Sequence, residues 1–200
     1  VPFIVGLDQW LPGGLDEDAK TYLKDFGAAT ASNGAVGLYH VENITPEAVK
    51  YGKDLIKENA QVYVVDDAEL ERVYKRKKKD ATPKLCFMGC PHMSLNQLID
   101  WTKKIEESLK KYGKTRVCIP TVFTAAPAVL KKFEETPYAA TLKQAGVITS
   151  YICPLMYMNN PLSEKMPVIT SSNKLRTYTS ARYYTDAEIL EQITKGGMTR

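Results

Sequence analysis

Short apolar runs alternate with capped helical patterns along most of the chain, and this alternation limits the folds that it can adopt. Six runs have the length of buried strands and are bounded by turn-forming residues: 34–41, 61–65, 84–89, 116–123, 147–154 and 167–172. A strand that is followed by a helix and then by another strand normally forms a parallel pair. The sequence therefore predicts an α/β fold in three layers, with a mostly parallel sheet and helices on both of its faces.

The segments between these runs carry the signals of helix ends. Three of the helices are expected to begin at paired capping residues: Asp66 with Glu69, Ser94 with Gln97, and Thr185 with Glu188. Helices are expected over 45–58, 66–79, 94–112, 126–146 and 185–197, the fourth being one helix or two because Pro137 interrupts it. Gly113 is expected just past the end of its helix, and 156–166 is expected to be a loop.

The length allows one large domain or two small ones, and we predict a single α/β domain over residues 1–200. The chain is 44% hydrophobic and 25% charged, which is ordinary for a soluble domain with its own core. No apolar run approaches the roughly 20 residues of a membrane span, and no secretory signal is present. The chain begins at Val1 without a methionine, so we expect a processed, trimmed or excised product.

The net charge and the cysteines indicate which partners and which cellular compartment to expect. The net charge of +4 comes largely from the basic run 75–79, which we interpret as a solvated helix end, because it lacks the aromatic residues of a nucleic-acid site. No nucleic acid and no membrane are expected as partners. Four cysteines without a secretion signal indicate reduced thiols and a cytoplasmic protein.

Parallel sheets bind their ligands at the carboxyl ends of the strands, which selects residues for a candidate site. The residues at or just past predicted strand ends that could take part in chemistry are His40, Cys90, His92, Cys153, Ser171, Ser172 and Lys174. Cys86 and Cys118 fall inside predicted strands, so we expect them to be core thiols.

Each selected residue also has a purely structural interpretation. Cys90 is compatible with a buried small side chain before a turn, His92 with a hydrogen bond to a loop carbonyl, and Lys174 with an exposed loop lysine. A Cys-Pro pair follows two different strands, at 90–91 and 153–154, and the stiffened chain after each thiol suits a ligand. Zinc is disfavoured because CxxC and HxxxH spacings are absent, and an iron–sulfur cluster needs further thiolates.

Four stretches together resemble the aconitase X family. They are "GAATASNGAVGLYHVENITPEA" (27–48), "GCPHMSLNQL" (89–98), "YICP" (151–154) and "VITSSNKLRTY" (168–178). The resemblance implies a hydro-lyase that removes water from a small hydroxylated carboxylate with the help of an iron or iron–sulfur centre. It implies Cys90 and Cys153 as metal ligands, Ser171, Ser172 and Lys174 as substrate-binding residues, and His40 and His92 as catalytic residues.

The resemblance also implies partners and substrates. The family's large polypeptide is longer, so this chain resembles its C-terminal half, without the N-terminal half or the small swivelling domain. Members of the family dehydrate mevalonate 5-phosphate or cis-3-hydroxy-L-proline. Ser171 and Thr177 stand where the family pattern has Asn and His. We therefore expect the isolated chain to be inactive; the alternative is a non-catalytic metabolite-binding module that retains the fold.

Overall fold

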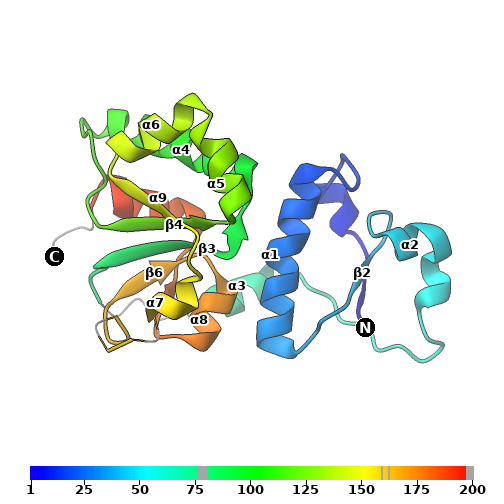
Figure 1. Cartoon of the computed structure of the whole chain (residues 1–200). Coiled ribbons are helices and arrows are strands. Elements are labelled where there is room, and N and C mark those ends of the chain that lie inside the picture. The colour runs from blue at the N-terminus through cyan, green and yellow to red at the C-terminus, as the bar shows by residue number, and fades with distance from the viewer. Residues whose placement is uncertain (76–80, 159, 162, 197–200) are drawn as a thin grey trace. The chain divides into compact units, whose positions relative to one another are not determined.

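The structure is a computed structural model that describes residues 1–75, 81–158, 160–161 and 163–196. The chain divides into two compact units, Val1–Lys77 and Lys78–Arg200 (Figure 1). The single domain predicted over residues 1–200 stays a prediction, because packing units and domains need not share their boundaries. Most of the basic run 75–79 lies outside the described residues.

The second unit is built around a parallel sheet of five strands in the order β5-β4-β3-β6-β7. Every neighbouring pair of these strands is parallel. The strands are β3 (Leu85–Met93), β4 (Thr121–Ala125), β5 (Val147–Ser150), β6 (Val168–Thr170) and β7 (Arg182–Tyr183). The mostly parallel sheet predicted from the sequence is confirmed.

Helices cover both faces of this sheet, and alternate residues of β3 reach the two faces. Figure 1 shows α4, α5 and α6 on one side of the sheet and α7 and α8 on the other. Cys86 and Met88 pack in the cluster that includes α4 and α9, whereas Phe87 packs against α7 and α8. The helices are α4 (Leu95–Lys111), α5 (Pro127–Glu134), α6 (Pro137–Gln144), α7 (Pro154–Met158), α8 (Asn173–Tyr178) and α9 (Asp186–Thr194).

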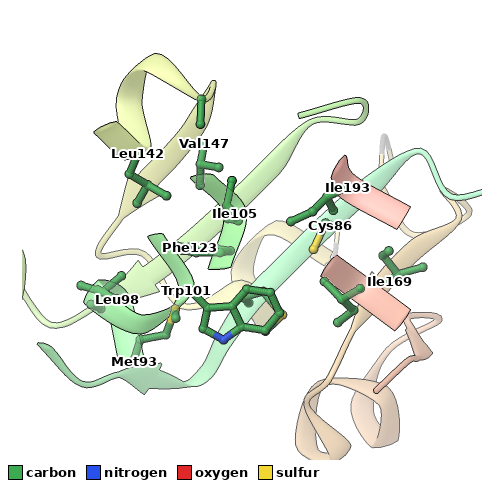
Figure 2. Close-up of a cluster of buried hydrophobic side chains, with 14 of the residues drawn as sticks. Cys86, Met93, Leu98, Trp101, Ile105, Phe123, Leu142, Val147, Ile169 and Ile193 are labelled. Atoms are coloured by element: carbon green, nitrogen blue, oxygen red, sulfur yellow. The ribbon is translucent and has the colours of Figure 1, made fainter. Parts of the chain in front are cut away.

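The larger core of this unit lies between the sheet and α4, α5, α6 and α9. Trp101 of α4 stacks edge-on against Phe123 of β4, with ring centroids 5.8 Å apart. Figure 2 shows Leu142 and Ile193 reaching the same cluster from α6 and α9. The three-layer arrangement of helix, sheet and helix predicted from the sequence is therefore present in this unit.

Helix ends in the second unit follow the sequence signals closely. Ser94 and Gln97 form a reciprocal capping box at the start of α4, and Thr185 and Glu188 form another at the start of α9. Pro137 does separate two helices, α5 and α6. The expected loop over 156–166 is wrong in part, because α7 extends to Met158.

The first unit has a small parallel pair of strands, β1 (Phe3–Ile4) with β2 (His40–Val41). Val41 and Ile44 pack with Leu23 of the long helix α1 in a separate hydrophobic cluster. The remaining elements are η1 (Leu7–Trp10), α1 (Glu17–Gly34), α2 (Pro46–Tyr51), η2 (Gly52–Leu55) and α3 (Asp67–Lys75). The strand expected over 34–41 is thus only two residues long.

The strand predicted over 61–65 is wrong. These residues lie in no strand or helix, and Val62 and Tyr63 are 86% and 84% exposed. β-forming side chains favour a strand only where a neighbouring strand pairs with it, and no strand among the described residues does so here. Within residues 1–75, 81–158, 160–161 and 163–196, no helix is both long enough and apolar enough to span a membrane.

Candidate functional site

The site begins at a break in the ladder between β3 and β4. The register of the two strands shifts between Met88 and Met93, and Gly89 between them has a φ of +108°. Thr124 donates its hydroxyl to the Gly89 carbonyl at 2.8 Å. A Cβ at Gly89 would lie 2.3 Å from the Thr124 carbonyl oxygen, so only glycine fits this close approach.

The break displaces Cys90, Pro91 and His92 from regular pairing. The strand predicted to end at Gly89 continues to Met93, so Cys90 and His92 lie in the irregular part of β3 and not after it. The Cys90–Pro91 peptide bond is cis. β3 pairs with β6 only at Leu85 and Cys86, which leaves this end of β3 beside the start of α8.

Ser172 ties α8 to this end of β3. Its hydroxyl donates a hydrogen bond to the Cys90 carbonyl. The same hydroxyl oxygen accepts from the Leu175 backbone N–H at 2.9 Å and caps α8. Ser172 therefore has its hydrogen-bonding capacity engaged by the protein, and it fixes the Cys90 backbone relative to the helix that carries Lys174.

The Cys90 thiol is under opposing influences. It is 8% exposed, and burial raises its pKa above the ordinary value because a thiolate is poorly solvated there. The neighbouring Ser172 hydroxyl and the positive charge of Lys174 both lower that pKa, and the Cys153 thiol raises it. Three other residues selected from the sequence thus act on the Cys90 thiol.

Cys153 and Lys174 differ from Cys90 in exposure. Cys153 is exposed and lies just past β5, directly before α7, where its carbonyl accepts from the Met156 N–H at 2.9 Å. Lys174 is half-buried in the first turn of α8. Ser171 directs its hydroxyl to the Met88 sulfur at 3.7 Å. The exposed Cys153 thiol can therefore be reached from solvent.

The two histidines lie in different units. His92 is half-buried at the end of β3, close in sequence to Cys90. His40 opens β2 in the first unit, where its N–H donates to the Pro2 carbonyl at 2.9 Å. Within the part of the chain that the structure describes, the Nδ1 atom of His40 is buried without a hydrogen-bond partner. His40 therefore belongs to a different unit from Cys90, Cys153, Ser172 and Lys174.

The ligands for an iron centre are present only in part. Cys90 and Cys153 are thiols of the kind that bind iron or an iron–sulfur cluster. Among the described residues, no group of three or more His, Cys, Asp or Glu side chains is placed to hold a metal ion. The two thiols fit as a partial ligand set, to which other ligands would have to be added.

The chain is similar to several known proteins. Residues 1–75 match the model of the aconitase X second domain. The phosphomevalonate dehydratase large subunit of Methanosarcina mazei is 32% identical over 160 residues, which cover 80% of this chain and 36% of that protein. The chain belongs to the aconitase X family.

Other members of the aconitase X family are similar over shorter stretches. The phosphomevalonate dehydratase large subunit of Methanothermobacter thermautotrophicus is 39% identical over 66% of this chain and 31% of that protein. The cis-3-hydroxy-L-proline dehydratase of Hypocrea jecorina is 32% identical over 49% of this chain and 16% of that protein. The chain thus spans about a third or less of these curated relatives.

A solved aconitase X has the same fold. The crystal structure of holo aconitase X from Thermococcus kodakaraensis superposes with a TM-score of 0.74 at 24% identity. The match covers 96% of this chain and 47% of that one. Both units of the aconitase X fold described above are therefore included in the match.

Some residues of the site were not selected from the sequence. Gly89 and Thr124 set the irregular end of β3. Tyr157 of α7 contacts the Phe87 ring, with ring centroids 5.4 Å apart, and its hydroxyl lies 3.3 Å from the Ser150 hydroxyl. A glycine at the end of an apolar run was the available signal for the break in β3. Tyr157 could not be found, because its segment was expected to be a loop.

The two other cysteines lie apart from this grouping. Cys86 is fully buried in the core, as predicted, and burial raises the pKa of its thiol. Cys118 was also predicted to be a core thiol, and that prediction is wrong because it is exposed. The strand expected to start at residue 116 starts at Thr121, after Pro120, so Cys118 precedes the sheet.

Proposed function

We propose that this chain is part of a hydro-lyase that removes water from a small hydroxylated carboxylate with an iron or iron–sulfur centre, and that it is incomplete on its own. The observation that carries the proposal is the grouping of Cys90 and Cys153 with Lys174 at one edge of a parallel sheet. Its support outside this chain is that related proteins are named as dehydratases.

Cys90 and Cys153 would hold the metal in this proposal. When bound, iron would supply a Lewis acid that assists the departure of hydroxide. Burial keeps the Cys90 thiol protonated, so metal binding there would release a proton. The further ligands would come from polypeptide outside residues 1–200, because the chain spans about half of the solved relative.

Lys174 would bind the anionic group of the substrate. Lys174 is half-buried in the first turn of α8, and its charge acts on the Cys90 thiol, so a carboxylate or phosphate there would gain a charge-assisted hydrogen bond. Ser172 would position Cys90, since its hydroxyl is already engaged by the Cys90 carbonyl and the Leu175 N–H. Ser171 would add a hydroxyl donor at the same strand end.

The histidines would serve the proton transfers that dehydration requires. A base must take a proton from the carbon next to the carboxylate, and His92 is the candidate that lies in the same strand as Cys90. His40, with a buried Nδ1 that makes no hydrogen bond to any described residue, is the second candidate. We propose mevalonate 5-phosphate as the substrate, with cis-3-hydroxy-L-proline as the alternative.

The proposed partners follow from the names of the relatives. Several are large subunits, so a small subunit and the remaining large-subunit polypeptide would complete the site. The small hydroxy acid, free or phosphorylated, would be the substrate, and the protein would work in the cytoplasm.

The test is an iron and sulfide determination on anaerobically purified protein. It compares the 200-residue chain alone with the same chain co-purified with the rest of its polypeptide and the small subunit. We expect iron only in the complete assembly, and its loss in Cys90→Ser and Cys153→Ser. Cys118→Ser is the matched control and should retain iron, because Cys118 lies before β4, away from the strands' carboxyl ends.

Two results would contradict the proposal. Robust dehydratase activity of the isolated chain would show that residues 1–200 are sufficient for catalysis. A complete assembly without iron that still binds mevalonate 5-phosphate would favour the alternative, a non-catalytic metabolite-binding module.

A further inference from the structure

A second pair of reactive side chains lies at the opposite end of the sheet from the candidate site. Cys118 precedes β4, so it is at the amino end of that strand, whereas Cys90 and Cys153 are at the carboxyl ends of theirs. The Nζ atom of Lys114 lies 3.0 Å from the Cys118 sulfur. Both side chains are exposed. A small oxidant in solution could therefore reach this thiol.

The end of α9 holds this pair in place. The backbone N–H of Cys118 donates to the Ile193 carbonyl at 2.7 Å, and its thiol donates to the Thr194 carbonyl at 3.2 Å. Lys114 donates to the Lys195 carbonyl at 2.6 Å. Three carbonyls that α9 leaves without helical partners are thus bonded by these two residues. The lysine nitrogen and the sulfur are held together by contacts on both sides.

We propose that Lys114 and Cys118 form a sulfur–nitrogen cross-link when the protein meets hydrogen peroxide. In the first step the Cys118 thiol is oxidised by two electrons to a sulfenic acid, and the peroxide is reduced to water. In the second step the neutral amine of Lys114 attacks that sulfur, the S–N bond forms, and the sulfenic hydroxyl leaves with an amine proton as water. The product lacks two hydrogens relative to the reduced chain, and a thiol reductant restores both residues.

The other cysteines do not offer this arrangement. Cys86 is fully buried, and Cys90 is nearly so. Cys153 is exposed like Cys118, so it should also be oxidised by peroxide. Within the described residues, Cys118 is the one cysteine whose sulfur accepts a hydrogen bond from a lysine ammonium. Cross-linking should therefore be specific to Cys118, while sulfenic acid formation should occur at both exposed thiols.

Peptide mapping of the full chain tests the cross-link. The chain is treated with hydrogen peroxide at mildly alkaline pH, digested with trypsin without reductant, and analysed by mass spectrometry. We expect the tryptic peptides 112–116 and 117–131 to be found joined, with the loss of two hydrogens, and to separate after reduction. Lys114→Met should lose the joined peptides and leave a Cys118 sulfenic acid that dimedone traps.

Lys111→Met is the matched control, since Lys111 is a neighbouring exposed lysine whose ammonium faces the Tyr112 ring instead. It should form the cross-link as the unchanged chain does. A trapped sulfenic acid at Cys118 without joined peptides in the unchanged chain would overturn the proposal, and so would an unoxidised Cys118. An equal yield in urea would also overturn it, because the fold would then not be what brings the two residues together.

Discussion

At Cys90, burial and charge act on the same thiol in opposite directions. Burial is the largest influence and raises the pKa, while the neighbouring Ser172 hydroxyl and the Lys174 charge lower it. A thiol whose pKa is raised in the folded state stabilises the fold below the unfolded pKa of about 8.5. That contribution is lost as the pH rises through the folded pKa, so Cys90 should weaken the fold only at alkaline pH.

The rate at which iodoacetamide alkylates Cys90 should report this balance. Alkylation requires the thiolate, so Lys174→Met should raise the Cys90 pKa further and slow alkylation at each pH below it. The measurement is the alkylated fraction of Cys90 against time over a series of alkaline pH values. Lys165→Met removes an exposed lysine and should leave the rate unchanged. An unchanged or faster rate in Lys174→Met would show that the Lys174 charge does not act on this thiol.

At the scale of elements, the close contact of β3 with β4 at Gly89 is the feature that sets the strand end. In Gly89→Ala, the alanine would have to adopt a φ of +108°, and its Cβ would lie 2.3 Å from the Thr124 carbonyl oxygen. Gly113, past the end of α4, has a φ of +62° but nothing within 4 Å of a Cβ. The two positions therefore separate backbone strain from steric overlap.

Gly89→Ala should cost roughly 3 kcal/mol or more in the free energy of unfolding, because the Thr124 backbone must move. Gly113→Ala should cost only about 1 kcal/mol, the strain of the left-handed conformation. Urea denaturation of the two variants and the unchanged chain gives both values. Equal losses in the two variants would mean that β4 adjusts without cost and that the contact does not define the strand end.

The elements that the sequence predicted well are those with a local signal. Ser94 and Thr185 satisfy the first N–H groups of α4 and α9 from three residues away, and such a cap can be recognised in the sequence. α1 was not predicted, although Asp16 caps it by accepting from the Ala19 N–H. Its run of small residues, such as those at 27–29, gives little apolar periodicity.

The residues of the candidate site could be predicted from the sequence where the end of a strand could be predicted. Cys90, Ser172 and Lys174 were selected because they end or follow strands, and the structure brings them together with Cys153. The bulge that displaces Cys90 depends on the approach of Thr124 from β4, a contact between segments far apart in the sequence. The same limit explains the error at 61–65. Its β-forming side chains favour a strand only beside a neighbouring strand, and no strand among the described residues pairs with them.

At the scale of the whole molecule, each unit has hydrophobic clusters of its own. The two clusters of the second unit consist of residues between 85 and 193, and the cluster of the first unit consists of residues between 4 and 44. A unit that buries its own core can unfold as a cooperative unit. The chain's two tryptophans report on the units separately, because Trp10 lies in the first and Trp101 in the second.

The fragment 78–200 should therefore fold without the first unit. In the Trp10→Phe chain, fluorescence follows Trp101 alone, whose ring packs against Phe123 in the core of the second unit. The urea midpoint of this signal should agree between that chain and the fragment. Leu142→Ala, at a fully buried position of α6, should lower the midpoint in both by an amount corresponding to about 2–5 kcal/mol. A fragment without a cooperative transition would show that the parallel sheet depends on residues 1–77, and the two units would then be one folding domain.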